Sequence, residues 1–118
     1  MNQYSNVLQL NLTVHVDGLV DVSNLVEENV YRMVQECLNN VRKHANTKDV
    51  ELILKQTKET LIVIVQDEGK GFDNNHQSKD NSNGLKHLQQ RTDLLKGQLQ
   101  IESKINKGTR IKIEIPLN

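Results

Sequence analysis

The sequence contains few of the residues that cross-link or stiffen small proteins. Among its 118 residues there is one cysteine, Cys37, and one proline, Pro116, and aromatic residues make up only 3%. A single cysteine excludes both an intramolecular disulfide and a zinc site built from cysteines, and it is typical of a reducing, cytoplasmic compartment. Because aromatic residues are so scarce, the core of this one domain has to be built mainly from Leu, Val and Ile.

An excess of charge and long apolar segments are also missing. Fifteen Lys and Arg residues balance fifteen Asp and Glu residues, so the formal net charge is zero. This balance argues against a nucleic-acid-binding protein and against a polybasic membrane module. No apolar run approaches the ~20 residues that span a membrane, and the polar residues 1–6 do not resemble a signal peptide. We therefore expect a cytoplasmic segment with no nucleic-acid partner and no direct membrane contact.

Two segments have the apolar spacing of amphipathic helices. Residues 26–45 place apolar side chains at intervals of three and four, with acidic residues near the start and basic residues near the end. A second helix is predicted over residues 85–96, with Gly97 as its C-terminal cap. Residues 73–83 contain no aliphatic or aromatic residue, which predicts a mobile loop before this second helix.

Alternating apolar and polar residues predict the strands. Residues 7–17 alternate cleanly, which predicts a strand covered on one side only. The order strand, helix, two strands, loop, helix, two strands predicts an α+β fold. We expect a two-layer sandwich within one domain, residues 1–118, with a mixed or antiparallel sheet and its helices on one face. Residues 61–65 are a continuous apolar run, which is typical of a more buried strand. The remaining predicted strands cover residues 49–56, 98–103 and 109–115.

Two clusters of polar residues could carry chemistry. Glu36, Asn40 and His44 recur every four residues along one edge of the first helix, where carboxylate and amide oxygens suit Mg²⁺ and its waters. Taken alone, the same spacing is also common on an ordinary polar helix surface. Asp67 follows the predicted buried strand and begins the run Asp67–Phe72, which has two glycines. Such a run lets a ligand approach the backbone closely, but it is equally common in a simple turn.

Two further motifs are weak on their own, and the standard nucleotide motifs are missing. Gly84 lies at the start of the predicted second helix, where free N–H groups bind phosphate well. Gly108 and Thr109 form a turn before the last strand. The sequence has no GxxxxGK[ST] loop, which excludes a Walker-type site, and no GxGxxG follows a strand, which argues against a Rossmann site.

Together, in this order and spacing, the four motifs resemble one family. The chain is similar over about residues 7–117 to the catalytic ATP-binding domain of bacterial sensor histidine kinases, which have the Bergerat fold and belong with gyrase-type and mismatch-repair ATPases. Within that family it is most similar to the kinases that signal to response regulators with LuxR-like output. The matching segments are Gln35–Ala45 for the N box, Asp67–Phe72, Gly84–Arg91 and Gly108–Thr109 for the three glycine boxes.

The resemblance implies that the ligands are ATP and Mg²⁺, and it implies a role for each matching residue. Asn40 corresponds to the asparagine that holds Mg²⁺, and Asp67 to the aspartate that binds the amine of adenine. Glu36 corresponds to the acid that either polarises the acceptor histidine or orders a water of the metal. The other matching residues are Lys43 and His44 at phosphate-contacting positions, Gly69 and Gly71 beside the base, Gly84 and Leu85 at the start of the helix below the triphosphate, and Thr109 near a bridging water.

The sequence also departs from the family pattern. Glu68 stands where the family often has asparagine, and Ser82 replaces the first glycine of the second box. Leu88-Gln89-Gln90-Arg91 replaces the usual Met-x-Glu-Arg, while Asp67 and Asn40 are both kept.

The family's phosphoacceptor histidine has no counterpart in this sequence. None of the four histidines lies on a helix flanked by an acid, as the acceptor does. We therefore expect this chain to be the catalytic part of a longer sensor, either free or membrane-anchored. Its partners would be a helical dimerisation and phosphoacceptor domain and a cognate response regulator, and residues 73–83 would be the ATP lid. Two alternatives share the fold: a serine kinase of the anti-sigma-factor type, and a module that binds ATP only as a switch.

Overall fold

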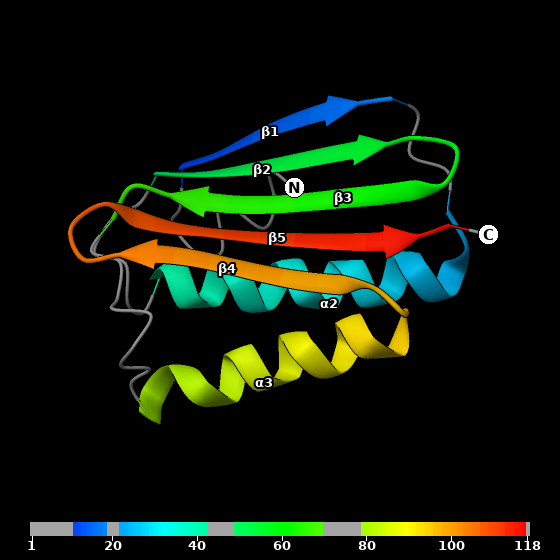
Figure 1. Cartoon of the computed structure of the whole chain (residues 1–118). Helices are drawn as coiled ribbons and strands as arrows, with labels where there is room; N and C mark the ends of the chain where they lie inside the picture. Colours follow the sequence, from blue (N-terminus) through cyan, green and yellow to red (C-terminus); the bar gives the residue numbers. More distant parts are fainter. Residues whose placement is uncertain (1–10, 19–21, 43–48, 70–78, 118) are drawn as a thin grey trace.

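The computed structural model describes residues 11–18, 22–42, 49–69 and 79–117, with the backbone alone for residues 79–85. These residues form five strands and two helices in the order predicted from the sequence (Figure 1). The mixed sheet and its two helices confirm the predicted α+β fold. The elements are β1 (Asn11–Asp17), α2 (Asn24–Asn40), β2 (Asp49–Gln56), β3 (Thr60–Asp67), α3 (Lys79–Leu94), β4 (Gln98–Lys104) and β5 (Gly108–Pro116).

The strand order in the sheet is β1-β2-β3-β5-β4, so β3 lies at the centre. β1 pairs with β2 in parallel, and the other three pairings are antiparallel. Leu61, Val63 and Val65 of β3 are all buried, as the continuous run of β-branched residues predicts. Asp67, the last residue of β3, therefore stands at the end of the best-covered strand of the sheet.

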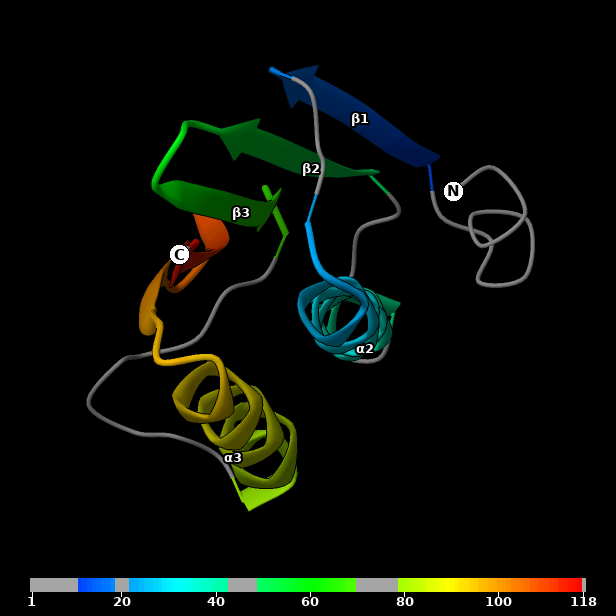
Figure 2. The same cartoon turned by 90° about the vertical axis from the view of Figure 1, so that its right-hand side faces the viewer.

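Both helices lie on the same face of the sheet (Figure 2). α2 contacts β3, and α3 contacts α2 and β4. One side of each central strand supplies the apolar residues that pack between the two layers, as expected for alternating side chains. Neither of the two helices in the described part of the chain is long and apolar enough to cross a membrane. The largest fully buried side chains include Met33, Leu38, Leu52, Leu61, Leu88, Ile113 and Ile115.

α2 forms the helix predicted over residues 26–45, with bounds at Asn24 and Asn40. Ser23 caps its start, because the Ser23 hydroxyl accepts a hydrogen bond of 3.3 Å from the amide of Val26. Cys37 lies in the core as a small apolar residue. Burial raises the pKa of its thiol to about 12, with a smaller effect from the Glu36 carboxylate. The predicted end of the helix, residues 43–45, lies outside the described residues.

The prediction for the start of the second helix was wrong. α3 begins at Lys79, so residues 79–83 of the predicted loop 73–83 are helical, and Gly84 and Leu85 lie inside the helix rather than at its start. The prediction took the absence of apolar side chains as evidence for a loop. Once a helix has formed, however, each added residue gains a backbone hydrogen bond without needing to bury a side chain. Residues 73–78 lie outside the described part of the chain.

The expectation that β1 is covered on one side was also wrong for most of the strand. Leu12 packs against the core, but Val14 is 38% exposed and Val16 is 56% exposed. β1 is an edge strand, and the main contacts of the described helices with the sheet are at β3 and β4. The predicted residues 7–10 of this strand lie outside the described residues.

The cap at the end of α3 differs in detail from the one predicted. Lys96, not Gly97, takes the left-handed conformation, with φ of 59°. The amide of Gly97 donates to the carbonyl of Thr92 at 2.9 Å, which closes the helix end. Gly97 is needed for a different reason, since a Cβ at this position would lie 2.5 Å from the carbonyl oxygen of Glu114 in β5. The glycine thus lets the chain turn closely against the sheet.

Replacing Lys96 with glycine is expected to stabilise the protein by about 0.5–1 kcal/mol. Glycine removes the steric cost of the left-handed conformation, and this gain exceeds the added entropy of the unfolded chain. The matched control is Lys86→Gly, the same change at an exposed position inside α3. That variant should lose about 1 kcal/mol. Urea unfolding of both variants measures the two effects, and equal losses would show that Lys96 is not strained.

Candidate functional site

The end of the sheet brings Asp67, Thr109 and Ser103 side by side. Asp67 of β3 pairs with Thr109 of β5, and Thr109 pairs with Ser103 of β4. Two residues earlier along the same face of β3 lies the buried Val65, so all three polar side chains belong to the helix-covered face. The core of the sandwich therefore ends in a row of one carboxylate and two hydroxyls.

The Asp67 carboxylate is half-buried and held by backbone amides. One carboxylate oxygen accepts a hydrogen bond of 2.9 Å from the amide of Gly69. Burial raises the pKa of Asp67 above its ordinary value, while hydrogen bonds from the amides of Gly69 and Thr109 oppose that rise. A carboxylate in this setting is fixed in orientation and well suited to accept a hydrogen bond from a ligand donor.

The two hydroxyls beside Asp67 form a short network. Ser103 Oγ and Thr109 Oγ1 lie 2.8 Å apart, and Ser103 Oγ donates to the carbonyl of Gly108 at 3.0 Å. Ser103 is buried and Thr109 is half-buried. Sequence analysis named Thr109 but missed Ser103, because only the strand pairing shows that the two residues are neighbours.

Gly108 is the position that allows β5 to lie so close to Asp67. Its φ is +98°, and a Cβ there would overlap the carbonyl oxygen of Asp67 and lie 2.8 Å from Cα of Glu68. No L side chain fits this combination of backbone conformation and contact. The motif Gly108–Thr109, which looked like a plain turn, thus has a steric requirement for glycine next to the carboxylate.

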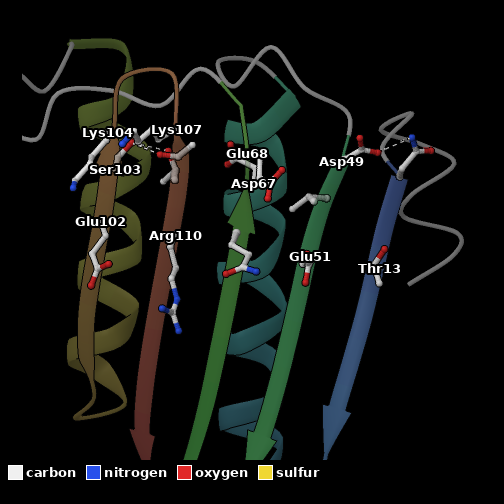
Figure 3. A pocket seen from close by; sticks show the side chains of 15 residues that line it. Thr13, Asp49, Glu51, Asp67, Glu68, Glu102, Ser103, Lys104, Lys107 and Arg110 are labelled. Atoms are coloured by element: carbon white, nitrogen blue, oxygen red, sulfur yellow. Dashed lines mark hydrogen bonds between the residues drawn. The ribbon is translucent and has the colours of Figure 1, made fainter.

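A cavity of about 920 Å³ opens at this end of the sheet (Figure 3). Asp67, Ser103 and Thr109 line it, together with residues from all five strands or their ends. Its charged side chains have both signs, with Asp49 and Glu51 on β2, Glu102 and Lys104 on β4, and Arg110 on β5. The cavity is therefore wide and polar, and Asp67 is one of the half-buried acidic groups that line it.

The residues predicted on α2 lie at a second place. Glu36 and Asn40 are half-buried, and Asn40 is the last residue of the helix. Glu36 lines a cavity of about 350 Å³ between α2 and α3, together with His87 and Arg91. Figure 1 shows that the C-terminal ends of α2 and β3 and the N-terminal end of α3 lie on the same side of the molecule. The described site residues are thus gathered from α2, α3, β3, β4 and β5 around one end of the sandwich.

Several predicted site residues cannot be placed. Lys43, His44 and Gly71 lie outside the described residues, and the side chain of Leu85 is not described. Gly84 and Leu85 belong to α3, as reported above. Among the described residues, no group of three His, Cys, Asp or Glu side chains could hold a metal ion by itself.

Sequence analysis missed one polar contact between the helices. Asn29 is only 4% exposed, and its side-chain oxygen accepts a hydrogen bond of 2.9 Å from Arg91 of α3. A signal existed in the sequence, since Asn29 stands one turn before Met33 on the apolar face of α2. A polar residue in that position indicates a buried hydrogen bond.

Comparison with known proteins identifies the same class of domain. A family model described as "Histidine kinase-, DNA gyrase B-, and HSP90-like ATPase" matches residues 25–118. The chain is 44% identical over 92 residues to the signal transduction histidine-protein kinase/phosphatase DegS of Brevibacillus brevis, and 37% identical over 91 residues to DegS of Bacillus subtilis. These matches cover 78% and 75% of this chain but only 24% of each relative. The chain thus spans about a quarter of the length of the curated relatives it matches.

Solved structures show the same fold. The histidine kinase domain of a blue-light activated histidine kinase from Erythrobacter litoralis superposes with a TM-score of 0.74 at 23% identity, over 98% of this chain and 57% of that one. The histidine kinase AdeS of Acinetobacter baumannii gives a TM-score of 0.73 at 14% identity, over 99% of this chain and 59% of that one. At these identities the superpositions support the architecture, and the functional conclusions rest on the site.

Proposed function

The chain belongs to the histidine kinase-, DNA gyrase B- and HSP90-like ATPase family, and from this premise we propose that it is the catalytic ATP-binding domain of a sensor histidine kinase. It binds ATP with Mg²⁺ and delivers the γ-phosphate to a histidine on a separate helical domain. The observation that carries the proposal is the half-buried Asp67 carboxylate, which the Gly69 amide orients beside Thr109 and Gly108. The names of both DegS relatives support protein histidine as the acceptor.

The base-binding part of the proposal uses the end of β3 and β5. The exocyclic amine of adenine donates to the Asp67 carboxylate, which has only acceptor atoms. The close approach of β5 at Gly108 places Thr109 beside that carboxylate. Gly69 and Gly71 leave room for the base against the backbone. A base that lacks the amine would leave the half-buried carboxylate without a donor, which gives the site its preference for adenine.

The phosphates would lie toward the ends of α2 and α3. Lys43 and His44 follow α2 and would supply charge to the phosphate oxygens, while Gly84 and Leu85 lie in the N-terminal half of α3. Asn40 fits Mg²⁺ because its amide oxygen is a hard ligand, partly exposed at the last turn of α2. The metal, when bound, would neutralise charge on the phosphates. Residues 73–83, of which 79–83 form the start of α3, would close over the nucleotide as a lid.

Glu36 is the proposed catalytic residue. Its half-buried carboxylate lines the cavity between α2 and α3, one helical turn before Asn40. There it would accept the N–H of the incoming imidazole, so that the other ring nitrogen remains a nucleophile toward the γ-phosphate. Positioning and charge neutralisation would supply the rest of the rate, as in other phosphoryl transfers. The phosphate would then pass to a cytoplasmic response regulator with LuxR-like output.

A transfer assay tests this function. The chain alone, incubated with ATP labelled in the γ position, is expected to bind nucleotide without labelling itself. Adding the phosphoacceptor domain of the full-length protein should produce an acid-labile label on that domain. Glu36→Gln should lower the rate of transfer by about 10²-fold or more while changing ATP affinity little, because the contact is made with the acceptor rather than with the nucleotide.

The matched control is Glu28→Gln, the same change at an exposed position on α2. It should leave both transfer and binding unchanged. An acid-labile label on the isolated chain would show that the acceptor lies within it. An acid-stable label on a serine of an added protein would identify a serine kinase instead.

As the pH is lowered, adenosine affinity is expected to begin to fall at a higher pH than it would with an aspartate of ordinary pKa. The raised pKa of Asp67 means that its carboxylate becomes protonated at a higher pH and then loses its acceptor role. The free energy of unfolding is expected to change in the opposite direction and to rise as the pH falls. A raised pKa in the folded state means that protonation of Asp67 favours folding. Calorimetric titration with adenosine, which has no ionisable phosphates, measures the first effect. Urea unfolding over the same pH range measures the second.

A further inference from the structure

The two helices are joined by a buried polar contact that no proposed catalytic role uses. The side-chain oxygen of Asn29 in α2 accepts a hydrogen bond of 2.9 Å from Nη1 of Arg91 in α3. The side-chain nitrogen of Asn29 donates to the carbonyl of Leu25 at 2.8 Å, one turn earlier in its own helix. Asn29 is 4% exposed, so both of its polar atoms are satisfied away from solvent. The second bond fixes the orientation of the amide that receives Arg91.

A dense apolar contact surrounds this hydrogen bond. Met33, one turn after Asn29, and Leu88, just before Arg91, are both fully buried. Thr92 Oγ1 donates to the carbonyl of Leu88 at 2.7 Å and lies 3.5 Å from the sulfur of Met33. The C-terminal half of α3 is therefore held to α2 by apolar packing and by side-chain hydrogen bonds, of which the bond from Arg91 to Asn29 joins two polar side chains.

The same contact borders the cavity between α2 and α3, which Arg91 lines together with Glu36. Asn29 and Glu36 are seven residues apart on α2, about 10 Å along the helix axis. Leu85 precedes Arg91 on α3 by six residues, about 9 Å. A rotation of α3 about the contact would thus shift the proposed phosphate-binding end of α3 while leaving β3 and β5 in place.

We propose that Asn29 and Arg91 are positioning residues that set the register of α3 against α2 and so shape the triphosphate part of the site. This inference rests on the proposed function, because it assigns the contact a role in holding the phosphates of ATP. An apolar residue at position 29 would fill the same space, but it would not favour one register of α3 over another. The hydrogen bond favours one register, because any other register would leave its donor and acceptor unpaired.

The experiment compares ATP with adenosine as ligands, because adenosine lacks the phosphates but keeps the base. Asn29→Leu removes the hydrogen bond and keeps the branching of the side chain, and Arg91→Met removes it from the other side. Asn29→Asp keeps an acceptor for Arg91. The matched control, Gln89→Ala, breaks the exposed hydrogen bond between Gln89 and Asp93 on the same helix. Dissociation constants come from titrations followed by NMR, and urea unfolding gives the stability of each variant.

Asn29→Leu and Arg91→Met are expected to raise the dissociation constant for ATP about tenfold, equivalent to about 1.4 kcal/mol. The constant for adenosine should change less than about twofold, because the base site lies on β3 and β5. Asn29→Asp should keep the ATP-to-adenosine ratio of the unmodified protein even if its unfolding midpoint falls, since burying a carboxylate is costly. Gln89→Ala should change neither ligand's affinity.

Two results would overturn the inference. Equal weakening of ATP and adenosine, or no change in either, would show that the contact contributes to stability alone. Loss of the wild-type ratio in Asn29→Asp would show that the contact to Arg91 is not what matters at position 29. If the unmodified chain binds neither ligand, the proposed function fails, and the inference fails with it. If it binds both ligands and Asn29→Leu leaves the ratio of their dissociation constants unchanged, the inference alone is wrong.

Discussion

Gly108→Ala is expected to abolish measurable ATP binding and to lower the free energy of unfolding by about 2 kcal/mol or more. The added Cβ would overlap the carbonyl oxygen of Asp67, and the φ of +98° is unfavourable for alanine. The strain can be relieved only by moving β5 away from β3. That movement would displace Asp67 and Thr109 from each other, and these two residues form the proposed base site.

The matched control for this variant is Gly18→Ala. Gly18 also has a left-handed φ, of +90°, and its Cβ would lie 2.8 Å from the carbonyl oxygen of Gln56. Gly18 follows β1, away from the end of the sheet that carries Asp67. Gly18→Ala should therefore lose stability but keep ATP affinity within about threefold of the unmodified protein. Calorimetric titration and urea unfolding of both variants separate strain in general from strain at the site. Full ATP affinity in Gly108→Ala would contradict the assignment of Asp67 and Thr109 to the base site.

Asp67→Asn is expected to weaken ATP binding by at least 10- to 100-fold, equivalent to about 1–3 kcal/mol, while the fold is retained. A carboxylate has only acceptor atoms, and one oxygen already accepts from the Gly69 amide at 2.9 Å. An asparagine offers one oxygen and one NH₂ group. Whichever way the amide turns, its NH₂ group faces a donor, either the Gly69 amide or the amine of adenine.

Asp49→Asn is the matched control, because Asp49 is an exposed carboxylate that lines the same cavity. Removing its charge tests whether the general negative potential of the cavity matters. We expect ATP affinity to change by less than about threefold in this variant. Similar losses in both variants would assign the effect to charge in the cavity rather than to a specific contact of Asp67. Circular dichroism and urea unfolding confirm that each variant is folded before its affinity is compared.

The order of the elements was predictable from the sequence because side-chain periodicity is a local property. The alternation in residues 109–115 and the spacing of three and four in α2 are visible within one element. The start of α3 was not predictable in this way, since residues 79–83 are all polar and their helical state leaves no apolar pattern. The exposure of Val14 and Val16 depended on which strands the helices cover, and β1 itself carries no information on that.

The site was predictable as a set of motifs but not as an arrangement. Resemblance identified Asp67 and Thr109, and the strand register then showed that they are direct neighbours. The steric need for Gly108 arises from a backbone contact with a distant strand. The bond between Asn29 and Arg91 joins residues 62 positions apart. Contacts of this kind depend on tertiary packing, which a single sequence does not encode in any local pattern.

The position of β1 in the sheet has a consequence for how the domain assembles. β2 and β3, and likewise β4 and β5, are joined by short hairpin turns, so each of these pairs can form early by closing a small loop. Among the described strands β1 pairs only with β2, in parallel, and all of α2 lies between them in the chain. Closing that long connection costs more conformational entropy. Burial of the β1 side chains offsets little of this cost, because most of them stay exposed. β1 is therefore expected to be the last strand to join the sheet and the first to leave it. Because Asp67 and Thr109 belong to β3 and β5, a domain in which β1 has come away would still hold its proposed adenine site together.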